Sequence, residues 1–241
     1  MSEEKKQAFR PKHLTVEDIR DGCMTLYGED NEETKLCMVQ EEFRQGIEMI
    51  QSFSPSVTFY GSARLPEDDP SYKQAQMIAK RIVEETGVSI LSGGGGGIME
   101  AANRGAYEAG GRSVGLTIKL PHDQKTNKYV TDSIPFYFFF TRKVSMSYTT
   151  EACLFFPGGF GTFDELFEVL TLKQTKKISD VPIILVGKEF WAPFQLAIQQ
   201  TMLEKYNTIT TQELSLYTIT DDVNEIVNII KQSKPGLGEL K

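Results

Sequence analysis

The residues best suited to chemistry lie in the stretch 157–168, which reads Pro-Gly-Gly-Phe-Gly-Thr-Phe-Asp-Glu-Leu-Phe-Glu. It follows an apolar run of strand length, residues 152–156, and opens a helical pattern in which Phe163, Leu166 and Leu170 share one face. A glycine turn between a strand and a helix exposes the unpaired N–H groups of the helix, which can bind a phosphate or a similar anion. We therefore expect an anion site at this turn.

Asp164 and Glu165 lie in the first turn of that predicted helix. Acidic residues in this position are often no more than complements to the helix dipole. A phosphate bound at the turn would, however, repel two neighbouring carboxylates unless at least one of them has a separate task. Glu165 is therefore a candidate for such a separate task, and the dipole role is its alternative.

Two further glycine-bearing turns follow predicted strands. Gly61-Ser62-Ala63-Arg64 ends the strand 57–61, and Ser92 is followed by five glycines, Gly93 to Gly97. Ser62 and Arg64 alone would be weak evidence, since they could merely cap and solvate the turn. Five glycines could form a flexible linker, but here they join a strand to a helix with no residues to spare. Because the carboxyl ends of parallel strands meet at one edge of the sheet, the three turns together could line one pocket.

Arg142 and Lys143 follow the apolar, aromatic stretch 134–140 and should emerge at the same edge of the sheet. Adjacent basic residues are most often a solvated surface. A guanidinium can also clamp phosphate or ribose oxygens, whereas lysine supplies a point charge. We favour a site role for Arg142, and for Lys143 both roles stay open.

The glycine spacing does not match the dinucleotide pattern, because the first strand–helix unit has no Gly-x-Gly-x-x-Gly with an acidic residue about twenty positions later. A nicotinamide cofactor is therefore disfavoured. A pyridoxal phosphate enzyme would need a buried lysine, and Lys143, beside Arg142, is a poor candidate. No cofactor is predicted.

Strand-like and helical segments alternate from residue 57 onward. The predicted strands are 57–61, 88–91, 113–118, 134–140, 152–156, 181–187 and 217–219, and the predicted helices are 72–85, 98–109, 141–150, 190–206 and 223–231. The last helix is expected to be capped by Thr220 or Asp221. This alternation predicts an α/β fold with a Rossmann-like, doubly wound, mainly parallel sheet and helices on both faces.

The chain divides into an N-terminal extension, residues 1–52, a main domain, residues 53–233, and a frayed tail, residues 234–241. Residues 1 to about 34 are polar, so we expect partial order there at best. One amphipathic helix follows, laid on the domain or on a partner subunit, with domain packing favoured. Its apolar positions recur in steps of three and four residues: Leu36, Val39, Phe43, Ile47 and Ile50.

The net charge of -7 argues against a nucleic-acid partner. Residues 1–50 carry most of it, with twelve acidic and seven basic residues. The cysteines Cys23, Cys37 and Cys153 lack metal-ligand spacing, and with 2 histidines in the chain no metal site is predicted. No apolar stretch approaches membrane length, so we expect no membrane association and a cytoplasmic location.

Three spaced motifs between about residues 57 and 191 resemble those of the Lonely Guy family, the cytokinin riboside 5'-monophosphate phosphoribohydrolases long labelled possible lysine decarboxylases. The motifs are Pro157-Gly158-Gly159-x-Gly161-Thr162-x-x-Glu165, Gly93-Gly94-Gly95-x-Gly97-Ile98-Met99-Glu100-Ala101-Ala102-Asn103 and Arg142-Lys143-x-x-Met146. Gly96 and Thr141 depart from the residues that many members carry there.

The resemblance implies hydrolysis of the N-glycosidic bond of a nucleoside 5'-monophosphate, of the AMP or cytokinin riboside monophosphate type, to a free base and ribose 5-phosphate. It implies Arg142 and Glu165 as catalytic residues and a nucleotide-binding main domain. The positions expected to contact substrate and phosphate are Gly61, Ser62, Arg64, Gly94, Gly95, Gly97, Met99, Glu100, Lys143, Gly158, Gly159, Gly161 and Thr162. A noncatalytic nucleotide- or cofactor-binding carrier of the same fold is the alternative.

The family's members are dimers or larger, so the resemblance also implies a homodimer or a larger homo-oligomer. The aromatic residues 136–140 and the amphipathic helix would each present a surface that a second copy could cover.

Overall fold

The structure is a computed structural model that describes residues 15–29, 31–119, 125–148 and 150–233. The first fourteen residues of the extension and the predicted frayed tail, residues 234–241, lie outside these ranges. No helix in the described ranges is long and apolar enough to span a bilayer.

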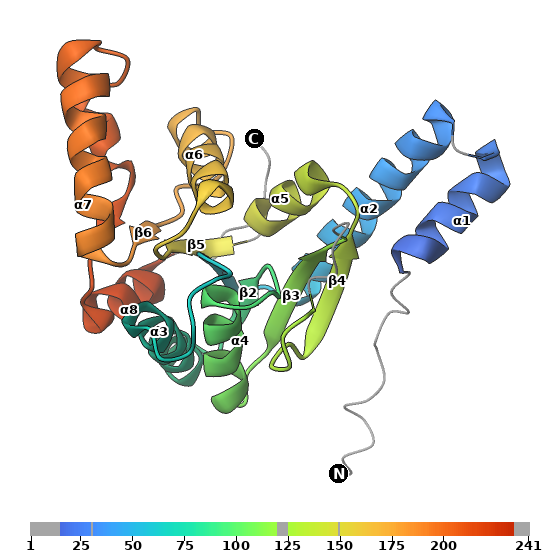
Figure 1. The fold of residues 1–241 in the computed structure, drawn as a ribbon, viewed down its shortest axis with the longest axis horizontal. Helices are drawn as coiled ribbons and strands as arrows, with labels where there is room; N and C mark the ends of the chain where they lie inside the picture. Colours follow the sequence, from blue (N-terminus) through green and yellow to red (C-terminus); the bar gives the residue numbers. More distant parts are fainter. Residues whose placement is uncertain (1–14, 30, 120–124, 149, 234–241) are drawn as a thin grey trace.

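Within the described residues, seven parallel strands form one sheet in the order β4-β3-β2-β1-β5-β6-β7 (Figure 1). The strands are β1 Ser56–Tyr60, β2 Ser89–Ser92, β3 Ser113–Ile118, β4 Asp132–Phe136, β5 Thr150–Phe155, β6 Ile183–Leu185 and β7 Thr218–Ile219. Each overlaps a predicted strand, so the parallel sheet is confirmed. The order reverses between β1 and β5, where Tyr60 lies in register with Phe155. Open parallel sheets bind ligands at such a switch point, outside the carboxyl ends of the strands.

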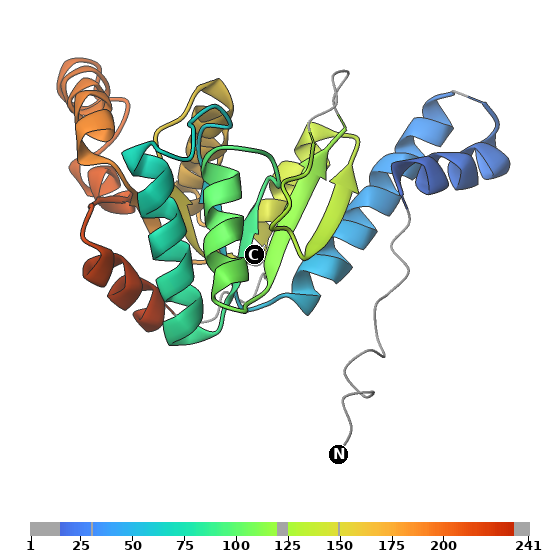
Figure 2. The ribbon, with the colours of Figure 1, turned by 60° about the horizontal axis from the view of Figure 1, so that its bottom comes forward.

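Both faces of the sheet are covered, which is why β1 and β5 are buried along their whole length. One face packs against helices that stand side by side in Figure 2: α3 Pro70–Thr86, α4 Ile98–Glu108 and α8 Val223–Gln232. The other face packs against the end of α2 Glu32–Ser52, α5 Phe139–Tyr148, α6 Phe160–Gln174 and α7 Lys188–Ala197. The doubly wound arrangement is thereby confirmed as well.

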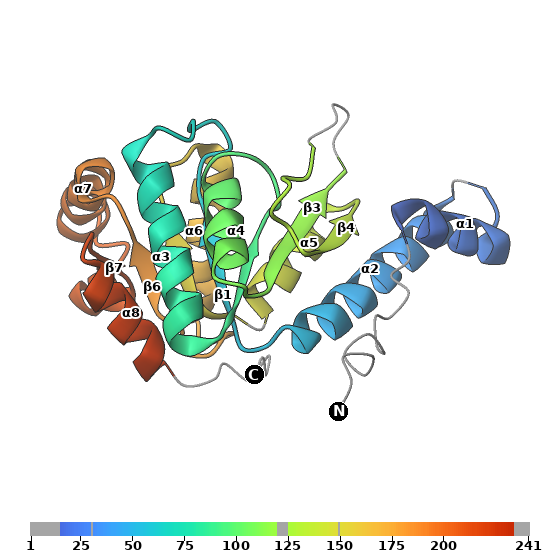
Figure 3. The same ribbon diagram turned by 90° about the horizontal axis from the view of Figure 1, so that it is seen from below.

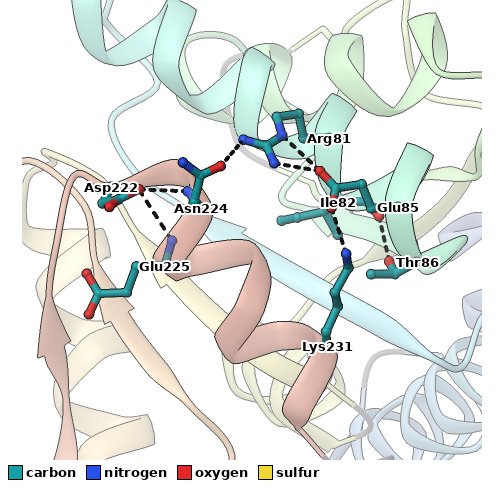
Figure 4. A network of polar contacts seen from close by, with 8 residues as sticks. All are labelled: Arg81, Ile82, Glu85, Thr86, Asp222, Asn224, Glu225 and Lys231. Atoms are coloured by element: carbon teal, nitrogen blue, oxygen red, sulfur yellow. Dashed lines mark hydrogen bonds and ion pairs between the residues drawn. The ribbon is translucent and has the colours of Figure 1, made fainter.

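Polar contacts join α8 to α3 beside their apolar interface (Figure 4). The Arg81 guanidinium donates to Asn224 Oδ1 at 2.9 Å, and Lys231 Nζ lies 2.7 Å from Glu85 Oε2. Exposed pairs of this kind contribute little stability, so the buried apolar side chains carry most of the packing energy.

The cap of α8 differs from the prediction by one or two positions. The Asp222 side chain accepts hydrogen bonds from the N–H groups of Asn224 and Glu225. The predicted cap, Thr220 or Asp221, is wrong because Asp221 accepts instead from the N–H of Gly187, 2.6 Å away, ahead of α7.

Two predicted boundaries also shift. The predicted strand 134–140 is too long, since β4 ends at Phe136 and α5 begins at Phe139. Residues 137 and 138 are apolar enough to resemble a strand, but their N–H groups bind a carboxylate of α2 instead of a neighbouring strand. The predicted helix 190–206 divides into α7 and the π-helical η2, Ile198–Lys205, which is followed by the 3-10 helix η3, Thr211–Leu216.

The extension is more ordered than predicted. A helix, α1 Val16–Tyr27, begins at a capping box formed by Thr15 and Asp18 and packs against α2. A disulfide between Cys23 and Cys37 joins the two helices, which extend past the β4 edge of the sheet in Figure 3. The expectation of partial order up to residue 34 is therefore wrong for the described part. The cysteine spacing gave no sign of this disulfide, and disulfides persist mainly in oxidising compartments.

The buried face of α2 is not the predicted stripe. Leu36 is 59% exposed, and of the predicted positions Ile50 is buried. The face that packs inward carries small and polar residues as well as apolar ones: Thr34, Met38, Glu42, Gly46, Met49 and Ile50. Apolar spacing alone predicted the wrong face because the contact with α5 does not depend on apolar residues. The two helices approach closely at Gly46, and the Glu42 carboxylate of α2 accepts hydrogen bonds from the residues before α5.

Candidate active site

The three glycine-bearing turns meet at the carboxyl edge of the sheet. Ser62 links them, because its N–H donates to the Pro157 carbonyl at 3.0 Å and its own carbonyl accepts from the Ile98 N–H at 2.9 Å. Gly97 has a φ of +62°, and a Cβ atom there would lie 2.2 Å from the Ser62 carbonyl oxygen. The structure therefore brings together the segments that sequence spacing assigned to one pocket, and their close approach requires glycine at position 97.

In the second turn, two carbonyl groups are bound by Asn127. The Asn127 N–H donates to the Gly94 carbonyl and its side-chain amide to the Gly95 carbonyl, each at 2.9 Å. The N–H groups of Gly95, Gly96 and Gly97 bind no acceptor among the described residues. Unpaired backbone donors are costly when buried, and an anion would satisfy them.

Asn127 was not among the predicted site residues, because a lone asparagine in a polar loop carries no pattern. The Asn127 amide also donates to Asn103 Oδ1 at 2.9 Å, and the Ser92 hydroxyl donates to the same oxygen at 2.7 Å. Ser92 Oγ in turn accepts from the Gly94 N–H at 3.0 Å. These hydrogen bonds hold the second turn in its conformation.

The third turn forms the N-terminus of α6. The helix has no side-chain cap, and within the described residues the N–H groups of Phe160, Gly161 and Thr162 have no acceptor. The Thr162 side chain folds over Gly158, where a Cβ atom would lie 2.2 Å from Thr162 Oγ1, while Gly159 and Gly161 face open space. The turn thus offers a second set of unpaired donors at the positive end of a helix dipole.

Arg142 lies beneath the second turn with 8% of its surface exposed. Its Nε donates to the Leu116 carbonyl at 2.7 Å, and a Cβ atom at Gly93 would lie 2.2 Å from Nη2. Burial lowers the pKa of the guanidinium, and the nearby Glu165 carboxylate opposes that effect. An arginine retains its proton in such an environment, so the site holds a fixed positive charge.

Glu165 faces Arg142 from α6, with 3.8 Å between Glu165 Oε1 and Arg142 Nη1. Burial raises the pKa of Glu165 to about 7, although the Arg142 charge acts to lower it. The separation exceeds a hydrogen bond, so the carboxylate retains free lone pairs for a ligand or a water. The structure brings the two predicted catalytic residues together as a charged pair, in which Arg142 is buried and the Glu165 side chain is 17% exposed.

Tyr60 lies beside this pair and was not selected from the sequence. Its ring stacks on Phe155 with 4.5 Å between centroids, at the switch point of the sheet. Burial raises the pKa of the Tyr60 phenol well above its usual range, and the Glu165 charge adds to the effect. The phenol therefore stays neutral beside the charged pair.

Lys143 points toward α6 and lies 3.1 Å from Asp164 Oδ2 and 3.2 Å from Glu168 Oε2. Burial acts to lower the pKa of Lys143, but the hydrogen bonds to Asp164 and Glu168 raise it. These contacts join α5 to α6, which gives Asp164 a partner apart from the helix dipole. A ligand-binding role for Lys143 stays a prediction.

The remaining predicted contact residues lie in or beside the first two turns. Arg64 is exposed, and its N–H donates to the Ser62 hydroxyl at 3.1 Å. Met99 places its sulfur against Gly93, and Glu100 lies near Gly96 in the first turn of α4. The ligand contacts of these three residues stay predictions.

The Gly97 geometry predicts a large effect of an alanine there. Gly110 shares the positive φ, at +72°, but a Cβ atom at that position would have no described atom within 4 Å, so Gly110→Ala measures the cost of a positive φ without a clash, about 1–2 kcal/mol in the left-handed helical region. Gly97→Ala adds the clash with Ser62 and is expected to lower the free energy of unfolding by about 2 kcal/mol more. Urea denaturation of both variants measures this difference, and equal losses would contradict the close approach of the first two turns.

A doubly wound parallel sheet, whose glycine turns hold unpaired N–H groups next to the Arg142–Glu165 pair, defines the class: a Rossmann-like protein with a candidate site at the carboxyl edge of its sheet. The sequence model of the family described as possible lysine decarboxylase matches residues 99–230, more than half of the chain. The chain belongs to this family, which is the Lonely Guy family that the motifs resemble.

Relatives with a named activity include plant proteins. The chain is 28% identical over 128 residues to the probable cytokinin riboside 5'-monophosphate phosphoribohydrolase LOGL3 of Oryza sativa subsp. japonica, covering 51% of this chain and 58% of that one. It is 30% identical over 101 residues to the cytokinin riboside 5'-monophosphate phosphoribohydrolase LOG2 of Arabidopsis thaliana, covering 42% and 47%. The chain thus spans about half the length of these relatives.

Solved structures share the fold. The molybdenum cofactor carrier protein of Chlamydomonas reinhardtii matches with a TM-score of 0.53 and 20% identity, covering 74% of this chain and 96% of that one. The molybdenum cofactor binding protein of Rippkaea orientalis matches with a TM-score of 0.53 and 18% identity, covering 73% and 93%. At these identities the likeness shows the fold alone.

Proposed function

We propose that this chain hydrolyses the N-glycosidic bond of a nucleoside 5'-monophosphate, of the AMP or cytokinin riboside monophosphate type, and releases a free base and ribose 5-phosphate. The observation that carries the proposal is the pair formed by buried Arg142 and partly buried Glu165 beside turns with unpaired N–H groups. Family membership and the activities named for the plant relatives support it.

The proposed reaction needs a carboxylate near the sugar. Breaking the C1'–N bond leaves the bonding electrons on the base and develops positive charge on the ribose, which an ionised Glu165 would stabilise. Glu165 would also orient the water whose oxygen bonds to C1' and accept its proton, which finally passes to the departing base. Arg142 would hold the phosphosugar, so that binding energy from the remote phosphate is used at the reacting carbon.

The raised pKa of Glu165 predicts a pH dependence. The carboxylate must be ionised to act, and its pKa is about 7, so kcat/KM should rise about tenfold per pH unit below pH 7 and level off above it. Asp164 raises the pKa of Glu165, so Asp164→Asn should move the rise to lower pH. Initial rates between pH 5 and 9 measure both effects, and a flat profile would contradict the role of Glu165.

The proposed function is tested by incubating the purified protein with a panel of nucleoside 5'-monophosphates and separating free base by chromatography. Release of base together with ribose 5-phosphate is the expected result. A noncatalytic nucleotide- or cofactor-binding protein is the alternative, and tight nucleotide binding without base release would select it.

We also propose a homodimer or a larger homo-oligomer. At the start of α5, Phe139 is 56% exposed and Phe140 is 48% exposed. An apolar cavity of about 410 Å³ between α6, α7 and η2 adds a further apolar surface. Light scattering at micromolar concentration should give at least twice the 27.1 kDa of one chain. A monomer mass with full activity would contradict the proposed homo-oligomer.

A further inference from the structure

We propose that Glu42, on α2, is a positioning residue for Arg142, and that it fixes the start of α5 so that the guanidinium faces Glu165. The inference rests on the function proposed for that pair. Glu42 lies before the first strand and outside residues 99–230, the part of the chain that the family model matches.

The Glu42 carboxylate caps α5 from another helix. It is 1% exposed, and Oε1 accepts from the Tyr137 N–H at 2.6 Å. Oε2 accepts from the Phe138 N–H at 3.3 Å and from the Thr141 hydroxyl at 2.7 Å. The start of a helix leaves N–H groups without intrahelical acceptors, and a nearby serine, threonine or aspartate usually accepts from them. Here the residues just before α5 are aromatic, and α2 supplies the acceptor instead.

A buried carboxylate is an expensive means of joining two helices. Among the described residues, no cationic side chain forms an ion pair with Glu42. Its charge is compensated by the hydrogen-bond donors and by the positive end of the α5 dipole. Apolar packing would hold two helices together without this desolvation cost. The directional hydrogen bonds add a defined position along and around the helix axis.

That position is transmitted directly to Arg142. Arg142 follows Thr141 in sequence, and its N–H donates at 3.3 Å to the carbonyl of Phe138, the residue whose own N–H binds Glu42. One turn further along both helices, Gly46 fits against Ser145, where a Cβ atom would lie 2.6 Å from Ser145 Oγ. Two contacts one turn apart restrict both sliding and rotation of α5.

Arg142, about 100° around α5 from Thr141, then meets the site. Arg142 reaches the Leu116 carbonyl at 2.7 Å and lies 3.8 Å from Glu165. A displacement of α5 by about 1 Å would change both distances substantially, and misplacements of that size cost reaction rate. In Figure 1, α2 lies beside α5 on the side away from α6. Glu42 therefore acts on the charged pair through its contacts with the start of α5.

The test uses Glu42→Gln, which preserves the size of the side chain but replaces one acceptor oxygen with a donor that faces other donors. The matched control is Glu48→Gln, the same change on the same helix, where Glu48 is exposed and pairs with Arg44 at 3.1 Å. In Glu42→Gln we expect the Glu165 carboxyl, followed by carbon NMR, to titrate at least about 0.5 pH units higher, because the Arg142 charge that lowers it has moved. We expect kcat/KM to fall about tenfold or more, and Glu48→Gln to change neither quantity.

A second pair of variants separates positioning from general loosening of the fold. In an Arg142→Ala background, Glu42→Gln should shift the Glu165 titration much less than in the wild-type background, since the larger cationic effect from α5 is gone and only that of Lys143 remains. An equal shift with and without Arg142, or no shift in folded Glu42→Gln, would overturn the proposal. If Glu42→Gln does not fold, Glu42→Asp retains the charge with a shorter reach, and the same titrations apply to it.

The titration also separates this inference from the proposed function. A wild-type protein that releases no base would refute the glycosidase activity. The position of Arg142 relative to Glu165 would still be reported by the carboxyl titration.

Discussion

Glu165→Gln is expected to lower turnover at least about a hundredfold while nucleotide binding persists. The substitution preserves shape and hydrogen bonding but removes the charge that would face the developing oxocarbenium ion. The partly buried position of Glu165 strengthens the effect, because charges interact more strongly away from water. Single-turnover rates and calorimetric binding of AMP to the variant measure the two expectations separately.

The matched control for this variant is Asp164→Asn, one residue earlier in the same helical turn. Asp164 is 59% exposed and pairs with Lys143, so its loss should cost less than about tenfold in turnover. Both acids would complement the helix dipole equally. Similar small losses in the two variants would indicate that Glu165 only complements the helix dipole.

Removing the 5'-phosphate from the substrate is expected to lower kcat/KM about a thousandfold. The unpaired N–H groups of the second and third turns would lose their ligand, and a charge-assisted hydrogen bond contributes roughly 1.5–3 kcal/mol. Two such bonds already account for the expected loss. Part of it should fall on kcat, because phosphate binding energy would be used at the reacting carbon.

Rates for adenosine and AMP, measured side by side, give this ratio. Ribose 5-phosphate and ribose are a second matched pair, and the phosphorylated sugar should be much the better inhibitor. Equal turnover of adenosine and AMP would contradict phosphate binding by the glycine turns.

Much of the fold could be predicted because the main domain follows simple periodicities. The buried strands appear as apolar runs, and glycine turns mark the ends of β1, β2 and β5. Since parallel strands share one carboxyl edge, the neighbourhood of Gly97, Arg142 and Glu165 also followed from their order in the chain. The distance between Arg142 and Glu165 could not be predicted, because it depends on how α5 and α6 pack.

The errors arise where a tertiary contact overrides the local pattern. The buried face of α2 holds Glu42 and Gly46, which spacing of apolar residues cannot select. Tyr137 and Phe138 leave the sheet because α2 offers their N–H groups a carboxylate. Asn127 and the disulfide between Cys23 and Cys37 likewise depend on segments that meet only in the folded protein.

The contact between α2 and α5 has a consequence for the order of assembly. The Glu42 hydrogen bonds join residues 95 to 99 positions apart, so β1, β2, β3 and β4 lie in the intervening segment. Closing a long loop has an entropic cost that must be met before the contact can stabilise anything. During synthesis α2 therefore emerges long before α5, the helix that it contacts. In refolding, helical signal should return before the ability to release base, because the guanidinium reaches its place when the two distant segments dock.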